Sequence, residues 1–548
     1  MSAHTLSHFS KDVLDQRAWD ATFDKYAINT DIFSAIKADG YETLLDFFEA
    51  HFTNRPHEFA FSLANKDQGQ HLTLADLNEL SLSLATHLQI LGQQLGLVQG
   101  DRIAVMMPNL LHYPVAMLAI IRAGYVLVNV NPLYTQRELQ HQLNDSGAKI
   151  LITHNSQADA LACLPETGIK KLISIGKDLD FIQDNQTIVT DSQRYTRPNL
   201  TSQDVAMLQY TGGTTGIAKG AMLSHGGLLA NLYQLDAVIG RLLDDQNDYI
   251  LTALPLYHIF AFSVCMLYGL HRHLANLLVA NPRDLPTLVN AIKQYRPVVL
   301  PAVNTLFNAM LTSDDFKTMD HSHVKFCVGG GMAILPDTAK RWEAVVGKPT
   351  IEGCGLSEAG TVISVNPPAA GYTQSIGIPL PLTDMKLMND DGEPVTDGSS
   401  GEIWVKGPQL MLGYWGRMDD KESYMVDGYF KTGDVGIMDK AGFFKIIDRK
   451  KDVVNVSGFN VFPSEIESVY NTHPDIIECC AVGVPDEHSN EAVKLFVVIH
   501  PHKNITANEL IDWGRQYLTA YKVPRRIDFI DQIPKSGVGK ILRRKLIE

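Results

Sequence analysis

With 548 residues, of which 45% are hydrophobic and 20% charged, the chain is long enough to form roughly two to four globular domains. Its 61 acidic and 47 basic residues give a formal net charge of −14, which argues against general nucleic-acid binding because that function needs a basic surface. The six cysteines have neither the spacing of a disulfide framework nor that of a zinc site. We therefore expect free thiols in a reducing compartment.

Targeting and membrane signals are weak along the whole sequence. The N-terminal segment lacks an apolar core and carries acidic residues, and the last three residues are not a peroxisomal address. The longest apolar stretch, residues 114–130, is interrupted by Arg122 and Asn129 and is too short to span a bilayer. We expect a cytoplasmic protein and leave open both peripheral contact with the inner face of a membrane and a homodimer.

The first half of the chain alternates helix-like and strand-like segments. Leucines at helical spacing predict a helix over residues 74–91, followed by a strand over residues 102–107. A helical pattern over residues 113–124 then leads into a strand over residues 126–130. This rhythm, continued by the apolar run at residues 150–152, predicts parallel sheets in an α/β fold.

Two later parts of the chain break this rhythm. Residues 176–203 are polar and weakly patterned, so we expect a surface connection there. Residues 401–447 contain short strands at 402–405 and 443–447, separated by glycine-rich turns, which predicts a small β structure.

A separate α+β unit is expected in residues 448–548, which leaves residues 1–447 as the larger N-terminal domain. Residues 453–456 are strand-like. Ser464 and Glu467 have the spacing of a capping box and predict the start of a helix.

The strongest local signal for chemistry is the run YTGGTTGIAKG at residues 210–220. Its glycines let the backbone approach a ligand closely, and its threonine hydroxyls, backbone N–H groups and Lys219 can bind phosphate oxygens. A hydrophobic segment precedes the run and a helix is expected from Gly226, a context typical of a phosphate loop. The spacing fits neither a Walker A loop nor a dinucleotide fingerprint. A mobile surface turn is the alternative.

Three further clusters carry weaker signals. Glu358 follows a glycine turn, and its carboxylate offers oxygen atoms, which are the ligands that Mg²⁺ prefers. Asp434 could accept the hydroxyls of a ribose, and Arg449 could reach both ribose and phosphate. Near the C-terminus, two glycines precede Lys540, which could be brought onto developing negative charge. Taken singly, each is more often a solvated charge.

In their order and spacing, these motifs resemble those of the adenylate-forming superfamily of acyl-CoA synthetases, luciferases and adenylation domains. The chain is similar to bacterial long-chain fatty-acid–CoA ligases within it, through residues 107–149, 254–262 and 448–467. The resemblance extends from about residue 41 almost to the C-terminus. It implies an α/β fold with a large N-terminal domain of two α/β subdomains plus a β-barrel, and a small mobile α+β lid.

The resemblance implies that ATP, Mg²⁺ and CoA are bound, and it assigns the nucleotide contacts by position. Contact with the phosphates is implied for Tyr210, Thr211, Gly212, Gly213, Thr214, Thr215, Gly216 and Lys219. Thr214 and Glu358 are the implied ligands of Mg²⁺. The implied frame of the adenine consists of Gly329, Gly330, Gly331, Glu352, Gly353, Cys354 and Gly355, and Ser357 is a further implied nucleotide-binding residue. Asp434 and Arg449 are the implied ribose ligands.

The acid is expected beside His258, in an apolar tunnel that includes Phe262 as a gate, Val328 and Gly329. These apolar residues could equally be ordinary core.

The resemblance also assigns roles in the C-terminal part of the chain. Lys540 would stabilise the transition state of adenylation, and Lys451 would be the hinge of the lid. Gly458 and Phe459 would lie near the pantetheine of CoA. Because Lys540 is needed in the first half-reaction and not in the second, the implied lid rotates between the two.

Two residues depart from the family pattern. Cys354 stands where the family usually has an aromatic residue, and Ser357 stands where it has threonine. Loss of a ring that stacks on adenine removes about 1 kcal/mol of contact, by analogy with base stacking on aromatic side chains. Ser357 keeps the hydroxyl.

Several other functions share part of this pattern. An amino-acid adenylation domain would need an acidic residue near His258, and residues 259–264 supply none. A medium-chain or aryl acid–CoA ligase and a luciferase-type oxygenase share every nucleotide motif. A non-catalytic acyl- or nucleotide-binding module is a further alternative, although such a module would not need to keep Lys219, Glu358 and Lys540.

Overall fold

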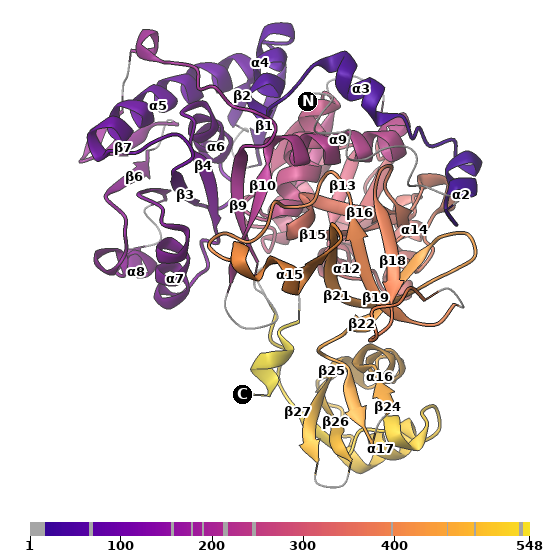
Figure 1. Cartoon of the computed structure of the whole chain (residues 1–548). Coiled ribbons are helices and arrows are strands. Elements are labelled where there is room, and N and C mark those ends of the chain that lie inside the picture. Colours follow the sequence, from indigo (N-terminus) through magenta and orange to yellow (C-terminus); the bar gives the residue numbers. More distant parts are fainter. Residues whose placement is uncertain are drawn as a thin grey trace. The chain divides into compact units, whose positions relative to one another are not determined.

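The structure is a computed structural model that describes residues 17–64, 70–154, 158–176, 179–188, 191–211, 218–243, 248–395, 398–457, 459–486, 489–535 and 541–547. The chain forms two compact units (Figure 1). The first comprises Met1–Asp384 and Lys406–Gly428, and the second comprises Met385–Val405 and Tyr429–Glu548. The boundary that the sequence places after residue 447 stays a prediction.

One sheet of the first unit has eight strands in the order β10-β9-β4-β3-β5-β6-β7-β8. The strands are β3 (Arg102–Met106), β4 (Val126–Val130), β5 (Ile150–Thr153), β6 (Lys171–Ile175), β7 (Phe181–Gln183), β8 (Gln186–Thr187), β9 (Val205–Thr211) and β10 (Lys219–Ser224). The strands from β9 to β6 run parallel, whereas β10, β7 and β8 are antiparallel to their neighbours. The central strands are buried along nearly their whole length, as expected for a parallel sheet covered on both faces.

The other sheet of the first unit has nine strands in the order β17-β16-β15-β14-β13-β11-β12-β1-β2. The strands are β1 (Phe59–Leu63), β2 (Gln70–Thr73), β11 (Tyr249–Thr252), β12 (Ala275–Leu278), β13 (Val299–Ala302), β14 (Phe326–Gly329), β15 (Thr350–Leu356), β16 (Thr361–Val365) and β17 (Ile378–Pro379). Its middle strands are parallel, and β2, β16 and β17 are antiparallel at the two edges.

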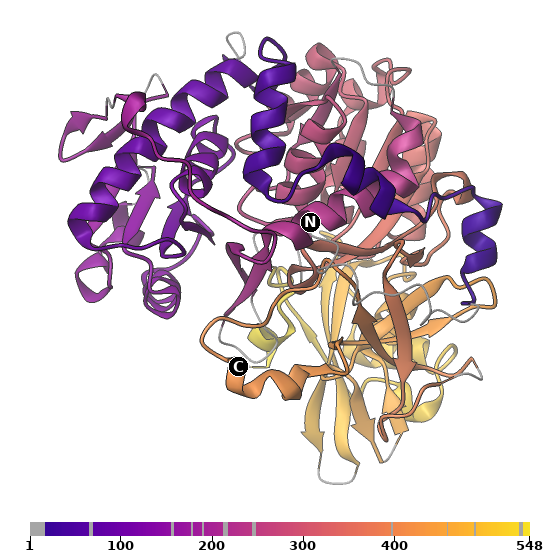
Figure 2. The same ribbon diagram turned by 45° about the horizontal axis from the view of Figure 1, so that its top comes forward.

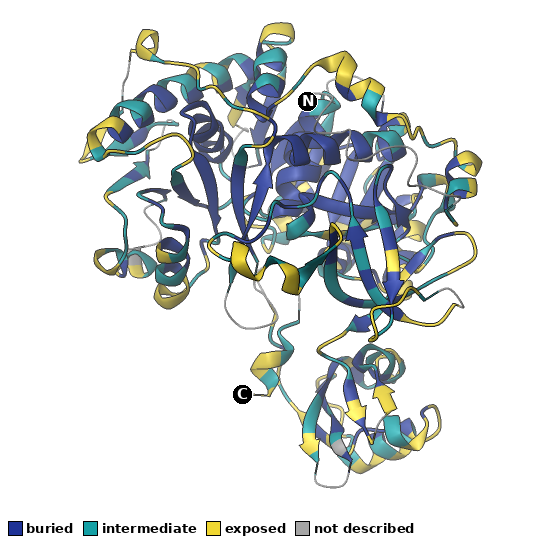
Figure 3. Ribbon diagram, viewed as in Figure 1, coloured by how far each residue is buried: buried dark blue, intermediate teal, exposed yellow. Residues whose placement is uncertain are grey.

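The helices of the first unit alternate with these strands in the chain. They are α2 (Asp20–Lys25), α3 (Ile32–Asp39), α4 (Leu44–Asn54), α5 (Leu74–Leu95), α6 (His112–Arg122), α7 (Gln136–Ser146), α8 (Ala158–Leu161), α9 (His225–Ile239), α10 (Tyr268–His271), α11 (Leu285–Tyr295), α12 (Asn304–Thr312), α13 (Asp314–Thr318), α14 (Pro336–Val346) and α15 (Lys421–Tyr424). The short strand β20 (Met425–Val426) follows α15. Helix α5 packs along α6, and the N-terminal helix α3 packs on α9 (Figure 2). Helix α9 is buried along most of its length (Figure 3).

The sequence sets the ends of α5 by local chemistry. Thr73 and Asp76 form a capping box at its start, and Gly96 ends it in the left-handed conformation. The helix predicted over residues 74–91 is therefore confirmed and runs four residues further, to Leu95. No helix in the described part of the chain combines the length and apolar character needed to cross a membrane.

The second unit contains two sheets. The first includes β18 (Asp384–Met388), β19 (Gly401–Lys406), β21 (Tyr429–Met438) and β22 (Phe444–Arg449), in that spatial order. The second has the order β24-β23-β26-β25, with β27 beside β26. Its elements are β23 (Val454–Val456), β24 (Phe459–Val461), α16 (Pro463–Tyr470), β25 (Ile476–Asp486), β26 (Asn490–Ile499), α17 (Ala507–Gly514) and β27 (Arg526–Phe529). Buried Ile466 and Tyr470 of α16 belong to the apolar core that covers this sheet.

The α/β class predicted from the sequence is confirmed, and two local predictions need correction. The segment 176–203 is not simply a connection, because β7 and β8 extend the eight-stranded sheet there. The capping box at the start of α16 is absent: Pro463 is the first helical residue, and the Ser464 hydroxyl donates to the carbonyl of Ile447. Glu467 is unavailable for capping because its carboxylate pairs with Arg543.

Candidate active site

The glycine- and threonine-rich run begins at the end of β9 and ends at the start of β10. These strands are antiparallel, with Thr211 opposite Lys219. Strand β10 separates the run from α9, so the local order is strand, run, strand and helix, where the sequence analysis expected the helix to follow the loop. The members of the run that lie outside the described residues, and whose roles stay predictions, are Gly212, Gly213, Thr214, Thr215 and Gly216.

Tyr210 is buried, and its polar end is bonded within the protein. The hydroxyl donates to the carboxylate of Asp145 at 2.6 Å. Burial, together with that carboxylate, raises the pKa of Tyr210 far above its ordinary value. The ring lies against Gly220, where a Cβ atom would come within 2.9 Å of a ring carbon. Tyr210 therefore supports the hairpin, and its hydroxyl proton is already engaged by Asp145.

Glu358, the predicted Mg²⁺ ligand, lies in the short 3₁₀ helix η7 (Ser357–Ala359) that follows β15. Its Oε1 accepts a hydrogen bond of 2.7 Å from the hydroxyl of Tyr414. The Nζ of Lys219 lies 5.2 Å from the centroid of the same tyrosine ring. Tyr414, which is not a predicted site residue, thus links Glu358 and Lys219, two residues predicted to lie near the phosphates.

The predicted adenine frame is built around the neighbouring parallel strands β14 and β15, with Gly329 opposite Glu352. Its glycines are required by close packing. A Cβ at Gly355 would lie 2.4 Å from the carbonyl oxygen of Thr361, and one at Gly330 would lie 2.9 Å from the ring of Phe260.

The remaining members of the frame fit around these contacts. Gly331 has a positive φ of 76°, which favours glycine, and Gly353 packs against the backbone of β16. Cys354 is partly exposed and takes part in no disulfide, and the nearby Ser357 opens η7.

Glu352 is the most perturbed carboxylate of this frame. Its side chain accepts a 2.7 Å hydrogen bond from the backbone N–H of Ile334, and it is only 8% exposed. Burial raises the pKa of Glu352 to about 7. The hydroxyl of Tyr372 donates to the carbonyl of Ile334 at 2.6 Å. Both the N–H and the carbonyl of Ile334, in the loop after β14, are therefore hydrogen-bonded.

The predicted acid-binding segment lies between β11 and α10. His258 Nδ1 accepts a hydrogen bond of 3.3 Å from the N–H of Phe260. Residues Ala261–Leu267 form a π-helix, a rare geometry that is common at functional sites. Phe262 lies on it and is fully buried, and Val328 on β14 is also buried. Both are part of the packed interior of the unit, and their roles as gate and tunnel wall stay predictions.

In the second unit, the two predicted ribose ligands face each other across an antiparallel strand pair. Asp434 on β21 is opposite Arg449 on β22, and their side chains form an ion pair with Nε and Oδ1 2.6 Å apart. Asp434 is buried, whereas the Arg449 side chain is partly exposed. Thr432 supports the turn, because its hydroxyl accepts from the N–H of Asp434 and donates to the carbonyl of Ile403.

The predicted hinge, Lys451, lies in the connection between β22 and β23. Burial lowers its pKa from the ordinary value of lysine. Phe459 begins β24 and is 56% exposed, with its ring stacked on that of Tyr521 at a centroid distance of 4.8 Å. Its neighbour Gly458 lies outside the described residues.

Lys540 also lies outside the described residues, but those on either side of it are well anchored. Lys535 and Ile541 form an antiparallel bridge, and Lys535 pairs with Glu478 at 2.5 Å. Arg543 makes a two-pronged ion pair with Glu467 in the interior of the second unit.

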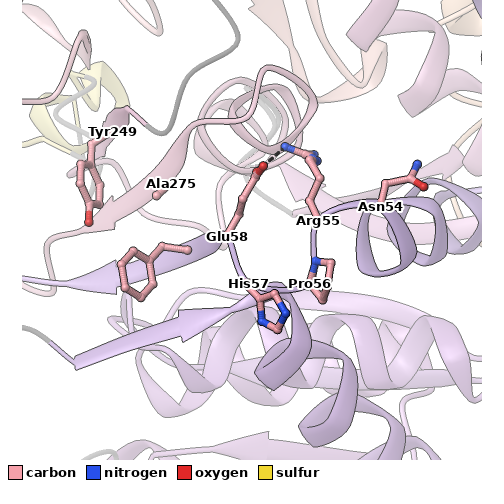
Figure 4. A pocket seen from close by; sticks show the side chains of 8 residues that line it. Asn54, Arg55, Pro56, His57, Glu58, Tyr249 and Ala275 are labelled. Atoms are coloured by element: carbon pink, nitrogen blue, oxygen red, sulfur yellow. Dashed lines mark hydrogen bonds and ion pairs between the residues drawn. The ribbon is translucent and has the colours of Figure 1, made fainter.

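A separate surface cavity of about 570 Å³ opens in the first unit (Figure 4). An ion pair of 2.8 Å between Arg55 and Glu58 lies in its wall. Its lining consists of Asn54, Arg55, Pro56, His57, Glu58, Phe59, Tyr249 and Ala275. None of these is a predicted site residue, so the cavity is distinct from the candidate active site.

Sequence reasoning missed the residues that hold the site together. Tyr414 lies in the aromatic run Gly413-Tyr414-Trp415, which could have marked it as a candidate. Tyr372 lies in a polar segment with no local signal, because its partner Ile334 is 38 positions away.

Comparison with known proteins gives matches along almost the whole chain. Residues 48–415 match the family described as AMP-binding enzyme, and residues 465–540 match the AMP-binding enzyme C-terminal domain. The chain is 43% identical over 546 residues to a long-chain-fatty-acid–CoA ligase of Escherichia coli, covering 94% of this chain and 96% of that protein. It is 33% identical to the protein of the same name from Bacillus subtilis, covering 88% and 90% of the two chains. The crystal structure of ATP-bound MatB from Rhodopseudomonas palustris is similar with a TM-score of 0.81 and 28% identity, covering 92% of this chain and 98% of that one.

Proposed function

The chain belongs to the AMP-binding enzyme family, and from this premise we propose that it is a long-chain fatty-acid–CoA ligase. It would convert a long-chain fatty acid, ATP and CoA into acyl-CoA, AMP and pyrophosphate. The observation that carries the proposal is that relatives bearing this name match the chain over nearly their full length. The arrangement of the described site residues supports it.

The first half-reaction makes the acid reactive. A carboxylate oxygen attacks the α-phosphorus of ATP, the bond to the bridging oxygen of pyrophosphate breaks, and the acyl group becomes linked to AMP. Negative charge grows on the phosphoryl oxygens, so Lys219 and Lys540 would act electrostatically. Asp434 would accept the ribose hydroxyls, and Arg449 would release part of its ion pair to contact the nucleotide.

The second half-reaction uses the thiol of CoA. The thiolate attacks the acyl carbon and AMP leaves, its phosphate keeping the electron pair of the broken bond. Phe459 offers an exposed aromatic ring for the pantetheine. Between the two steps, rotation about Lys451 would move Lys540 away from the reacting groups and bring Phe459 towards them.

The residues present fit a Mg²⁺ ion whose ligands are mostly phosphate oxygens and water molecules. Among the described residues, no cluster of three or more histidine, cysteine or acidic side chains could hold a metal by itself. Glu358 offers one carboxylate, which suits an ion held by one or two protein oxygens and the substrate phosphates. Thr214 would supply a second oxygen. The ion would offset charge on the transferring phosphoryl group when bound.

The preference for a long apolar acid is the finer part of the proposal. It is supported by the apolar, buried surroundings of His258, which include Ile259, Phe260 and Phe262. Peripheral membrane contact and a homodimer stay predictions of the sequence.

The proposal is tested by release of pyrophosphate and AMP with ATP, Mg²⁺ and CoA across acids from acetate to oleate. Benzoate, cinnamate and mixed amino acids are the controls. We expect the highest kcat/KM with long-chain acids and repeated turnover only when CoA is present. Turnover limited to short or aromatic acids would overturn the fatty-acid assignment, and no turnover with any acid would favour a binding module.

A further inference from the structure

The backbone around Tyr414 is bonded to both elements that carry phosphate-side residues. The N–H of Met411 donates to the carbonyl of Glu358 at 2.7 Å. Four residues later, the N–H of Trp415 donates to the carbonyl of Gly220 on β10 at 2.8 Å. This short stretch therefore ties η7 to the strand that starts with Lys219.

The Tyr414 side chain is fixed in the same place. It is only 8% exposed, and its ring packs edge-on against Tyr424 at a centroid distance of 4.8 Å. The Tyr424 hydroxyl accepts a hydrogen bond of 3.2 Å from the N–H of Tyr414. Together these contacts favour the observed orientation of the phenol, in which its hydroxyl donates to Glu358.

The charges on either side of this phenol are otherwise uncommitted within the described part of the chain. There, Oε2 of Glu358 has no hydrogen-bond partner and Lys219 has no carboxylate within ion-pair distance. An aromatic face attracts an ammonium group, and a hydroxyl gives a strong hydrogen bond to a carboxylate. One residue can therefore hold a cation and an anion apart without pairing them with each other.

We propose that Tyr414 is a positioning residue that holds Glu358 and Lys219 ready for a metal-bound triphosphate. This inference rests on the proposed function of the site. It predicts that Tyr414 acts on the binding of the metal–nucleotide complex and on adenylation, and that it does not act on the thioester step, which involves no triphosphate.

The Tyr414→Phe variant removes only the hydroxyl and keeps the ring. We expect the Mg²⁺ concentration that half-saturates ATP–pyrophosphate exchange to rise about ten-fold, the size typical for loss of an outer partner of a metal ligand. Thioester formation from supplied acyl-AMP should not change. Tyr414→Leu, which also removes the ring beneath Lys219, should in addition raise the KM for ATP.

Tyr233→Phe is the matched control. Tyr233 is also buried in the first unit and donates a 2.6 Å hydrogen bond to a carboxylate, that of Asp39, which is not a predicted site residue. Tyr233→Phe should leave the Mg²⁺ dependence unchanged, so a shift found in both variants would indicate a merely structural effect and overturn the inference.

A binding measurement tests the inference without turnover. Electron paramagnetic resonance of Mn²⁺, with a non-hydrolysable ATP analogue present, gives the Kd with which each folded variant binds the metal–nucleotide complex. We expect Tyr414→Phe to weaken this Kd about ten-fold relative to both wild type and Tyr233→Phe. Equal values for the two variants would overturn the role of Tyr414. Failure of the proposed function would show differently, as absence of acid-dependent pyrophosphate exchange in the wild-type protein.

Discussion

The two compact units hold their predicted site residues in different ways. In the first unit, Glu358 and Glu352 are each bonded to a residue without a predicted ligand role, Tyr414 and Ile334 respectively. In the second unit, the two predicted ribose ligands, Asp434 and Arg449, are bonded to each other.

This difference predicts where substitutions will matter. In the first unit, a change at a supporting residue should alter the chemistry while leaving every predicted ligand in place, as a metal ligand depends on its outer partners. In the second unit, the predicted ribose ligands would have to give up part of their ion pair to contact the nucleotide, so substitution of either should affect binding directly. The following experiments test this contrast, from the largest expected effect to the smallest.

Lys540→Ala should have the largest effect. It removes the positive charge that is proposed to stabilise the negative charge developing on the phosphoryl oxygens in the first half-reaction. We expect ATP–pyrophosphate exchange to fall about 10²–10³-fold, with thioester formation from supplied acyl-AMP preserved. Lys545→Ala, which removes a lysine five positions further along, is the control. Equal loss of both half-reactions would remove Lys540 from the mechanism.

Asp434→Asn tests the self-paired ligands of the second unit. The change weakens both the ion pair with Arg449 and the acceptance of ribose hydroxyls. We expect the KM for ATP to rise by roughly 10- to 100-fold, the range for hydrogen bonds to charged groups, with little change in the KM for CoA. An unchanged KM for ATP would show that Asp434 does not contact the nucleotide.

Glu352→Gln tests the first unit through pH. Because burial raises the pKa of Glu352 from 4.5 to about 7, the folded protein holds this proton more tightly than the unfolded chain does. The resulting stability is fully present below pH 4.5 and is lost as the pH rises through about 7.

Glutamine cannot ionise and can still accept the bond from Ile334. At pH 8, Glu352→Gln should therefore be more stable than wild type by about 3 kcal/mol, and the gain should shrink as the pH falls and vanish below pH 4.5. Urea unfolding across this pH range is the measurement. A stability difference independent of pH would contradict the assignment.

Cys354→Tyr has the smallest expected effect. It restores the aromatic residue that the family pattern has at this position, and the partly exposed thiol leaves room for contact with a ligand. A gain of about 1 kcal/mol in stacking would lower the Kd for ATP roughly five-fold. Titration of both proteins with ATP by calorimetry would detect this, and weaker binding by the variant would show that the ring does not reach adenine.

The parts of the fold that the sequence predicts well are those whose pattern is local. The strand over residues 126–130 is β4 residue for residue, because it is a short apolar run bounded by turns. The start of α5 follows from a threonine and an aspartate three positions apart. The packing around Gly355 gives a physical reason for one glycine of the predicted adenine frame, whose contact with a nucleotide stays a prediction.

The parts that the sequence could not predict depend on partners far along the chain. Glu467 has the spacing of a capping residue, but its carboxylate pairs with Arg543, which lies 76 positions away and could not be linked to it from the sequence. Tyr414 lies 56 positions from Glu358, and no periodicity links the two. Candidate site residues could therefore be proposed from residue type and spacing, whereas the residues that support them could be identified only from the tertiary structure.

The most direct test of the central claim follows the oxygen atoms of the acid. A long-chain fatty acid labelled with ¹⁸O in its carboxylate is incubated with the wild-type protein, ATP, Mg²⁺ and CoA, and the products are analysed by mass spectrometry. Formation of an acyl adenylate predicts one labelled oxygen in AMP and none in pyrophosphate. Label in pyrophosphate or inorganic phosphate, with unlabelled AMP, would show attack at another phosphorus and would contradict the account.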